Sequence, residues 1–326
     1  MKDQTEHKAR YKIFIDGSEG TTGLRIHERF AGRDDLRLLP IDPQLRKDPA
    51  ERKRLIAESD ITFLCLPDAA AAESAALWED CGNETVRLID TSTAHRTLDG
   101  WAYGFPELSA AHRRKIADGK KIAVPGCHAT GFLALAYPLL SRKILPADYP
   151  VSCFSITGYS GGGKAAIAKY QAKDRDPQLL APQEYALSQQ HKHLKEMREL
   201  SGLSRLPLFS PIIADYYSGM VVSVPLYSEL LDQKPTPVQL RQVFAEYYEG
   251  EPFIRVMPFG AEERLGGMMA GNGCSGWDGL ELYVTGNKDR ILLTARFDNL
   301  GKGASGAAVQ CLNLMLGCGE AKGLQL

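Results

Sequence analysis

The chain has 326 residues, of which 44% are hydrophobic and 24% charged, and its formal net charge is −1. This balance is typical of a soluble globular protein long enough for two domains. It argues against a nucleic-acid-binding surface, and no apolar run reaches the roughly 18 residues that cross a bilayer. Seven cysteines without pair spacing argue against a disulfide framework and a metal site, and they predict a reducing, cytoplasmic location.

A polar stretch, Met1–Arg10, opens the chain, and we expect a flexible tail there rather than a signal peptide. Strand-like and helix-like runs then alternate, with apolar helical runs such as Leu24–Phe30 and Ala69–Trp78 between the strands. The alternation predicts an α/β domain with a doubly wound parallel sheet, whose ligands lie at the carboxyl ends of the strands. The expected strands are Tyr11–Asp16, Leu36–Ile41, Ile61–Leu66, Val86–Asp90 and Lys121–Val124.

A glycine-rich turn joins the first strand to the first helix. Its spacing is G-x-x-G-x-x-G rather than the commoner G-x-G-x-x-G, and an ordinary strand-to-helix loop is the alternative interpretation. Its place as the first such turn of the series favours a dinucleotide pyrophosphate, held by close backbone approach and by the helix N-terminus. The expected cofactor-binding residues here are Gly17, Ser18, Gly20, Thr21, Thr22 and Gly23.

The choice between NAD and NADP stays open at the second strand. Asp42 ends that strand, and an acid there normally binds the ribose hydroxyls and selects NAD. Arg46 and Lys47 follow closely, and such cations pair with a 2′-phosphate. Two further loops leave carboxyl ends of strands, Leu66–Asp68 and Asp90–Arg96, and the second carries Ser92 and Arg96.

Cys127 follows a Pro-Gly turn and precedes an apolar helical run, Phe132–Leu140. That order places a thiol at a helix N-terminus, where unpaired N–H groups and the macrodipole favour an anion. The pattern predicts a nucleophile with a lowered pKa, and it places backbone N–H groups where they can stabilise an oxyanion. The alternative is a buried structural cysteine.

Beyond about residue 150 the pattern changes to strand-rich sequence. Helical segments are expected near Pro182–Leu200 and Pro237–Glu249, and a last helix, about Ala304–Leu316, is expected to pack back on the first domain. We therefore predict a dinucleotide-binding domain of residues 1–126 with 302–326, and an α+β substrate and dimerisation domain of residues 127–301 with a mostly antiparallel sheet. Its expected strands are Val151–Tyr159, Leu206–Ile213, Met220–Tyr227, Leu280–Thr285 and Arg290–Phe297.

Two more loops have residues suited to ligand binding. Gly158–Lys164 contains three consecutive glycines, which allow close backbone approach, and Lys164 is a candidate phosphate partner. A mobile hairpin loop is the alternative. Asp298–Gly303 either is a simple turn or brings Asn299 and Lys302 to the cofactor.

His191 and His193 lie two residues apart, so both point to one face if the segment is extended. No third ligand of suitable spacing follows, which argues against a metal. An imidazole suits a thiol enzyme that must also move a proton. A solvated polar segment is the alternative.

Taken together, these motifs resemble the N-acetyl-γ-glutamyl-phosphate reductase family of arginine biosynthesis, in its shorter subtype. They occur in the family's order over nearly the whole chain, and the cysteine and His-Lys-His motifs are the more specific ones. Lys195 stands where we expect the family's proline. The segments that carry the resemblance are Asp16–Gly23, Asp90–Arg96, Tyr103–Leu108, Pro125–Gly131, His191–Leu194 with Glu196 and Met197, and Asp298–Gly303.

The resemblance implies reduction of an acyl phosphate by NADPH through a cysteine thioester. It implies that Cys127 is the nucleophile and His191 the acid/base, and that the enzyme is a homodimer or homotetramer acting on a small molecule and phosphate. We expect further cofactor contacts from Ser92, Gly161, Gly162 and Asn299, and substrate contacts from Arg96, Ser160, Lys164 and His193. Two alternatives remain: a related enzyme acting on an aspartate or aminoadipate substrate, and an NADP-sensing regulator without catalysis.

Overall fold

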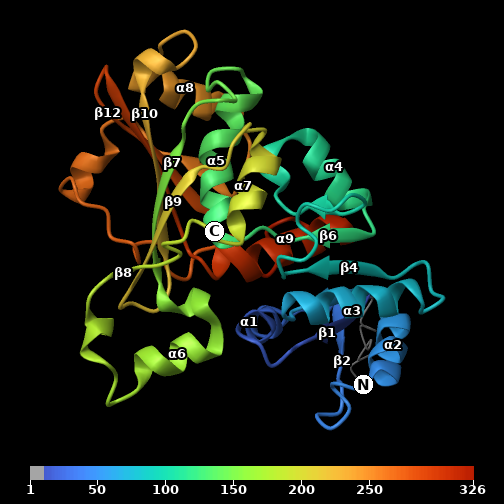
Figure 1. The fold of residues 1–326 in the computed structure, drawn as a ribbon. Helices are drawn as coiled ribbons and strands as arrows, with labels where there is room; N and C mark the ends of the chain where they lie inside the picture. Colours follow the sequence, from blue (N-terminus) through green and yellow to red (C-terminus); the bar gives the residue numbers. More distant parts are fainter. Residues whose placement is uncertain (1–10) are drawn as a thin grey trace, which may run out of the picture.

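The computed structural model describes residues 11–326, which form two β-sheets with helices packed around them (Figure 1). The stretch Met1–Arg10 lies outside the described residues. In the first sheet every paired strand is parallel, in the order β2-β1-β3-β4-β6-β5. Its strands are β1 (Tyr11–Asp16), β2 (Leu36–Leu39), β3 (Ile61–Leu64), β4 (Arg87–Asp90), β5 (Ala102–Tyr103) and β6 (Lys121–Ala123).

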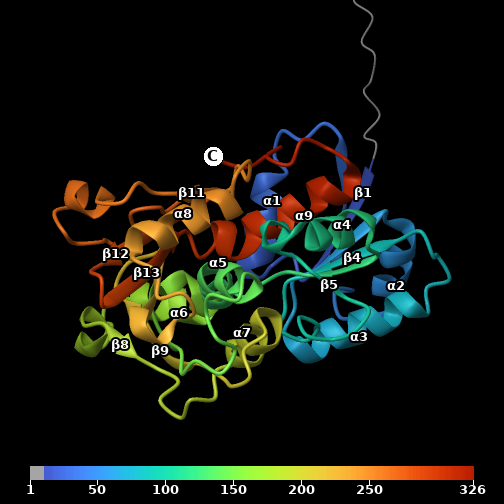
Figure 2. The same ribbon diagram turned by 90° about the horizontal axis from the view of Figure 1, so that it is seen from above.

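Helices cover both faces of this sheet, which confirms the doubly wound architecture. One face packs against apolar side chains of α1 (Thr21–Arg29), α4 (Ala110–Asp118) and α9 (Gly306–Leu316). The other packs against α2 (Pro49–Glu58) and α3 (Asp68–Glu79). Figure 2 shows α9, near the end of the chain, beside α1 and α4. The prediction that the last helix returns to the first domain is therefore confirmed, because α9 buries its apolar side chains against this sheet.

The second sheet has seven strands in the order β11-β12-β13-β10-β7-β9-β8. Four of its strand pairs are antiparallel, and the pairs β7–β9 and β11–β12 are parallel. The sheet is therefore mixed and mostly antiparallel. Its strands are β7 (Ser152–Gly158), β8 (Gln183–Glu184), β9 (Leu208–Ala214), β10 (Met220–Tyr227), β11 (Ile254–Val256), β12 (Leu280–Gly286) and β13 (Arg290–Phe297).

Three helices contribute to the main core on one face of this sheet: α5 (Cys127–Ser141), α7 (His193–Ser201) and α8 (Pro237–Tyr247). A fourth helix, α6 (Gly163–Gln171), follows β7 and a short 3₁₀ turn. The opposite face of the sheet keeps large apolar side chains exposed, namely Phe154, Ile156, Leu208, Tyr227 and Leu292. No helix in the described part of the chain is long and apolar enough to cross a membrane.

The predicted helix over Pro182–Leu200 is wrong in its first half. There β8 pairs with the edge of β9, and α7 begins only at His193. Ala186 and Gln189 have φ values of 53° and 56°. Helical backbone excludes such left-handed residues, so the helix cannot extend back through them. The Gly158–Lys164 segment is likewise no hairpin loop, since it forms a short 3₁₀ turn and the first residues of α6.

Candidate active site

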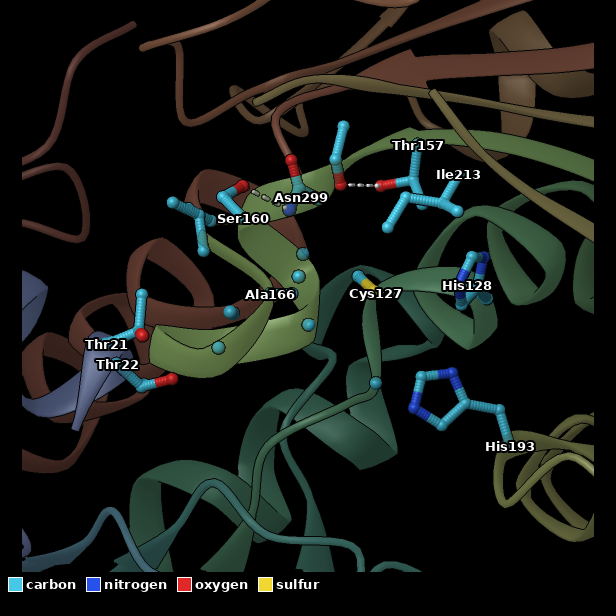
Figure 3. Close-up of a pocket in the computed structure, with 18 of the residues that line it drawn as sticks. Thr21, Thr22, Cys127, His128, Thr157, Ser160, Ala166, His193, Ile213 and Asn299 are labelled. Atoms are coloured by element: carbon cyan, nitrogen blue, oxygen red, sulfur yellow. Dashed lines mark hydrogen bonds between the residues drawn. The ribbon is translucent and has the colours of Figure 1, made fainter. Parts of the chain in front are cut away.

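Cys127 is the first residue of α5, and Gly126 is the N-cap with extended backbone. The side chain lines a cavity of about 650 Å³, hereafter the Cys127 cavity, whose walls come from both sheets' loops (Figure 3). Gly303 lies behind the cysteine, where an added Cβ would stand 2.9 Å from the Cys127 Cβ. The segment after β13 therefore approaches Cys127 as closely as glycine permits.

The pKa of the Cys127 thiol is raised to about 11, chiefly because the group is buried. The Arg96 charge and the His128 backbone N–H act in the opposite direction, but they do not outweigh burial. The prediction of a lowered pKa is therefore wrong for this arrangement, although the helix start is where we expected it. With this raised pKa the thiol is protonated at neutral pH.

Three imidazoles gather beside the cysteine. The ring centroids of His191 and His193 are 4.7 Å apart, and those of His128 lie 5.4 and 5.5 Å from them. Burial lowers the pKa of His128 to about 3 and that of His191 to about 4, and it takes the pKa of His193 well below its usual value. All three rings are therefore neutral at pH 7, the form that accepts a proton.

His191 and His193 differ in their hydrogen bonds. Nδ1 of His191 accepts the His193 backbone N–H at 3.1 Å, so the neutral ring carries its proton on Nε2. Nδ1 of His193 is buried without a hydrogen-bond partner among the described residues. A Cβ added to Gly126 would lie 2.3 Å from His193 Nε2 and 2.5 Å from Arg96 Nη1. His193 and Arg96 thus lie against the residue that precedes Cys127, and only glycine fits between them.

The buried Glu196 carboxylate links three groups around Gly126 by hydrogen bonds. It accepts hydrogen bonds from Arg96 Nη1 at 3.0 Å, from the Tyr103 hydroxyl at 2.6 Å and from the Gly126 backbone N–H at 2.8 Å. Arg96 also donates to the carbonyl oxygens of Val124 and Thr91. The two side chains are 7% and 2% exposed, so this is a buried ion pair with its remaining hydrogen bonds satisfied.

The glycine-rich turn has the backbone that a pyrophosphate cradle needs. Gly17 has a φ of 86°, and an added Cβ would lie 2.3 Å from the Cys65 carbonyl oxygen. A Cβ on Gly23 would lie 2.6 Å from the Gly17 carbonyl oxygen. Both glycines therefore allow the tight turn, whereas Thr21 and Thr22 line the Cys127 cavity.

A second cavity of about 400 Å³ adjoins this turn, hereafter the Lys164 cavity. Gly20, Thr21, Thr22, Ser92, Arg96 and Lys164 all line it. Arg96, Thr21 and Thr22 line both cavities, so the two adjoin at the helix start of α1. Lys164 lies in this cavity and not beside Cys127. Ser18 instead lines a third cavity, between the turn and the end of β2.

The segment that follows β7 lines the Cys127 cavity with Ser160, Gly161 and Gly162. Asn299 comes from the loop after β13 and joins it there: its amide donates to the Ser160 hydroxyl at 3.0 Å, and its oxygen accepts the Gly219 backbone N–H at 2.8 Å. Lys302 is not at this cavity, because it is buried in an ion pair with Glu107. The structure thus brings Cys127, His191, His193, Arg96, Ser160 and Asn299 to one cavity.

Comparison with known proteins shows which family this chain belongs to. The N-acetyl-gamma-glutamyl-phosphate reductase 2 of Nostoc is 44% identical over 322 residues, which cover 96% of this chain and 99% of the relative. The enzyme named N-acetyl-gamma-glutamyl-phosphate reductase in Brucella ovis is 45% identical over 94% of this chain and 99% of its own. The chain belongs to the N-acetyl-γ-glutamyl-phosphate reductase family.

Two further comparisons agree with this assignment at the level of the fold. A family model described as the semialdehyde dehydrogenase dimerisation domain matches residues 127–299 of this reductase-family chain. Among solved structures, the aspartate semialdehyde dehydrogenase of Francisella tularensis has a TM-score of 0.71 at 16% identity, covering 94% of this chain and all of its own. Aspartate semialdehyde dehydrogenase II of Vibrio cholerae has a TM-score of 0.67 at 16% identity, covering 95% and 99%.

Several side chains of this reductase-family site had no role assigned to them from the sequence. Glu196 lies three residues after His193 on the same face of α7, a spacing that a helix makes adjacent. His128 follows the cysteine directly, and Lys192 lies between the two histidines. No sequence pattern pointed to Tyr185 as a site residue, because its segment was predicted to be helical.

Near the expected adenosine end, the Asp42 carboxylate accepts the Gln44 backbone N–H at 2.8 Å and Arg46 Nε donates to the Pro43 carbonyl oxygen at 2.9 Å. Both side chains are exposed. Within residues 11–326, no group of three histidine, cysteine or acidic side chains could hold a metal ion.

Glu196→Ala should lower the free energy of unfolding by about 3–5 kcal/mol, because it leaves the Arg96 guanidinium buried without its counter-ion. Urea unfolding followed by circular dichroism measures the change. Glu199→Ala is the matched control on the same helix, since Glu199 is exposed and its only ion pair among residues 11–326 is with Arg198, and it should change the same quantity by less than about 0.5 kcal/mol. Equal effects of the two substitutions would contradict the role of Glu196.

Proposed function

We propose that this chain reduces N-acetyl-γ-glutamyl phosphate to N-acetylglutamate 5-semialdehyde with NADPH, through a thioester on Cys127. Membership of the reductase family supports the reaction class. The charge of the side chains that line the Cys127 cavity is the observation that supports this choice of substrate. In the described chain no aspartate or glutamate lines it, whereas Arg96, Lys169 and Lys192 do.

A cavity with cations and no carboxylate suits a substrate that is anionic and has no free ammonium group. N-acetylation removes that group from glutamate, while an aspartyl phosphate keeps it. Burying an ammonium ion without an acceptor is costly, so the cavity disfavours the aspartate alternative. It disfavours an aminoadipyl phosphate with a free amine for the same reason.

The chain's own residues supply the acyl-transfer chemistry. We propose that Cys127 loses its proton to the unprotonated ring nitrogen of His191, which lines the same cavity, and that the thiolate attacks the acyl carbon. The carbon–oxygen bond to phosphate breaks, and a thioester remains on the sulfur. We propose that backbone N–H groups at the start of α5 stabilise the oxyanion. For the anionic groups of the substrate and the leaving phosphate we propose Arg96, Ser160, Lys164 and His193.

The cofactor fits the turn between β1 and α1, where glycine is required at Gly17 and Gly23. We propose that Gly17, Ser18, Gly20, Thr21, Thr22 and Gly23 hold its phosphates, with Ser92, Gly161, Gly162 and Asn299 along its length. NADPH supplies the hydride that reduces the thioester to the aldehyde. The turn and the Cys127 cavity meet at Thr21 and Thr22, which supports one continuous path between them.

We further propose a division into residues 1–126 with 302–326 and residues 127–301, since α9 packs on the first sheet. The match to a dimerisation domain supports an oligomer, which we propose to be a homodimer or homotetramer joined through the exposed apolar face of the second sheet. Seven free cysteines support the reducing cytoplasm as its compartment.

Phosphate-dependent NADP⁺ reduction tests the proposal in the reverse direction. N-acetylglutamate 5-semialdehyde should exceed aspartate semialdehyde in kcat/KM by at least about a hundredfold, because the latter brings an unpaired ammonium into the cavity. The same assay with NAD⁺ decides the cofactor, and we expect NADP⁺ to give the higher kcat/KM. A preference for aspartate semialdehyde would overturn the substrate, and no turnover with any semialdehyde would favour the NADP-sensing regulator.

A further inference from the structure

A chain of three hydrogen-bonded side chains runs from the core of the second sheet into the Cys127 cavity. The Ser155 hydroxyl on β7 lies 2.7 Å from Nδ1 of His128, and Nε2 of His128 lies 2.8 Å from the Tyr185 hydroxyl. Ser155 is fully buried, His128 is 3% exposed, and Tyr185 lines the cavity. The mechanism above uses none of the three.

The proton positions along this chain follow from its hydrogen bonds. Burial lowers the pKa of His128 to about 3, so the ring is neutral and carries one proton. The Ser155 hydroxyl has no other hydrogen-bond partner in the described structure and no access to solvent. If His128 donated to it, the serine proton would be buried without an acceptor. The arrangement that satisfies every donor has Ser155 donating to Nδ1 and Nε2–H donating to the Tyr185 oxygen.

In that arrangement the Tyr185 proton is free to point into the cavity. Burial and the nearby Cys127 sulfur raise the pKa of Tyr185, so the hydroxyl stays protonated at neutral pH and acts as a donor. Ser155 and His128 thus turn an ordinary tyrosine into a hydrogen-bond donor of defined direction.

Tyr185 lies at the end of the cavity away from the nucleotide turn. Figure 3 shows His128 and Ile213 on one side of Cys127, with Thr21 and Thr22 on the other. Gln183 on β8 pairs with Ile213 on β9, and both line the cavity. Gln183 and Tyr185 are two residues apart on an extended segment, so they share one face. This end therefore offers neutral donors beside an apolar wall.

We propose that Tyr185 is a specificity-determining residue that donates a hydrogen bond to the acyl oxygen of the N-acylated substrate, and that Ser155 and His128 are its positioning residues. The acetyl group has an amide oxygen beside a methyl group, which matches a neutral donor beside Ile213. The substrate carboxylate would instead pair with the cationic side chains of the same cavity. The inference rests on the proposed function, because only an N-acylated substrate has this oxygen.

Tyr185→Phe tests the contact with two aldehydes in the phosphate-dependent assay: N-acetylglutamate 5-semialdehyde and glutarate semialdehyde, which lacks only the acetamido group. The KM for the first should rise about 5- to 100-fold with kcat within about twofold, since one hydrogen bond to a bound group is lost. The kcat/KM for glutarate semialdehyde should not change. Tyr216→Phe is the matched control, because the Tyr216 hydroxyl has no hydrogen-bond partner in the described chain and does not line the cavity.

A double-mutant cycle separates positioning from simple packing. Ser155→Ala should raise the same KM in the wild-type background and have no further effect on it in Tyr185→Phe, because it acts through that hydroxyl. Additive effects, or an equal loss with both aldehydes in Tyr185→Phe, would overturn the inference. Wild-type enzyme that fails to turn over N-acetylglutamate 5-semialdehyde would instead overturn the proposed function, before any variant is compared.

Discussion

Cys127→Ser should abolish reductase turnover, with kcat reduced by more than about a thousandfold. A serine hydroxyl ionises far less readily than a thiol, and in acyl transfer it is both a poorer nucleophile and a poorer leaving group. NADPH binding, measured by fluorescence titration, should stay near the wild-type value, since the glycine-rich turn is formed by other residues. Cys81→Ser is the control: Cys81 is also partly buried and lines neither the Cys127 nor the Lys164 cavity. Turnover close to wild type in Cys127→Ser would refute the thioester.

The pH dependence of alkylation tests the same cysteine without a substitution. With a thiol pKa raised to about 11, the thiolate fraction of the free enzyme is small at neutral pH and grows as the pH rises. Inactivation by iodoacetamide should therefore accelerate by about tenfold per pH unit between roughly pH 7 and 10. A rate that is already constant below pH 8 would mean that the helix start and Arg96 outweigh burial after all.

His191→Asn should lower kcat by about a hundredfold to ten-thousandfold with a modest change in KM, because proton transfer occurs in the transition state. His193→Asn should act mainly on the KM for phosphate in the reverse direction, since His193 lies against Arg96 and Gly126. Steady-state kinetics of the two variants are compared under identical conditions. A small effect of His191→Asn with a large loss of kcat in His193→Asn would reverse the two roles.

The pH profile of the wild-type enzyme gives an independent check on these imidazoles. Burial, Lys192 and Arg96 lower the pKa of His191 to about 4, so the ring stays neutral and able to accept a proton as the pH falls from 8 to about 5. The kcat/KM should lose its base only as the pH falls through about 4. A loss centred near the usual histidine pKa of about 6.5 would show that the base is solvated.

Local sequence was enough to predict the elements that carry these groups. The order strand, Pro-Gly turn, cysteine and apolar run predicts the start of α5, because Gly126 and the following residues decide that helix end by themselves. The glycine-rich turn after β1 is predictable for a similar reason, since Gly17 has a positive φ and Gly23 lies against the Gly17 carbonyl oxygen within the same turn. Alternation of strands and helices predicts the parallel sheet.

Sequence failed where pairing with a distant strand overrode local preference. The stretch before α7 has a helix-compatible composition, yet β8 completes the edge of β9 and left-handed residues at Ala186 and Gln189 interrupt the helix. That pairing is what brings Tyr185 to the cavity. Edge pairing depends on an unpaired strand elsewhere in the fold, which a local window does not contain.

The sequence by itself indicated the candidate groups and the elements that carry them: a thiol at a helix start, two imidazoles at the beginning of a helix, and glycines in the turn after the first strand. Only the tertiary structure decided their chemical state. The helix start alone favours a thiolate, but burial by residues far along the chain raises the pKa of Cys127 instead. The Glu196 carboxylate meets Gly126 across 70 residues, and His128 meets Tyr185 across 57. Desolvation and hydrogen bonding depend on all neighbours in space, so they are settled only when the chain has packed.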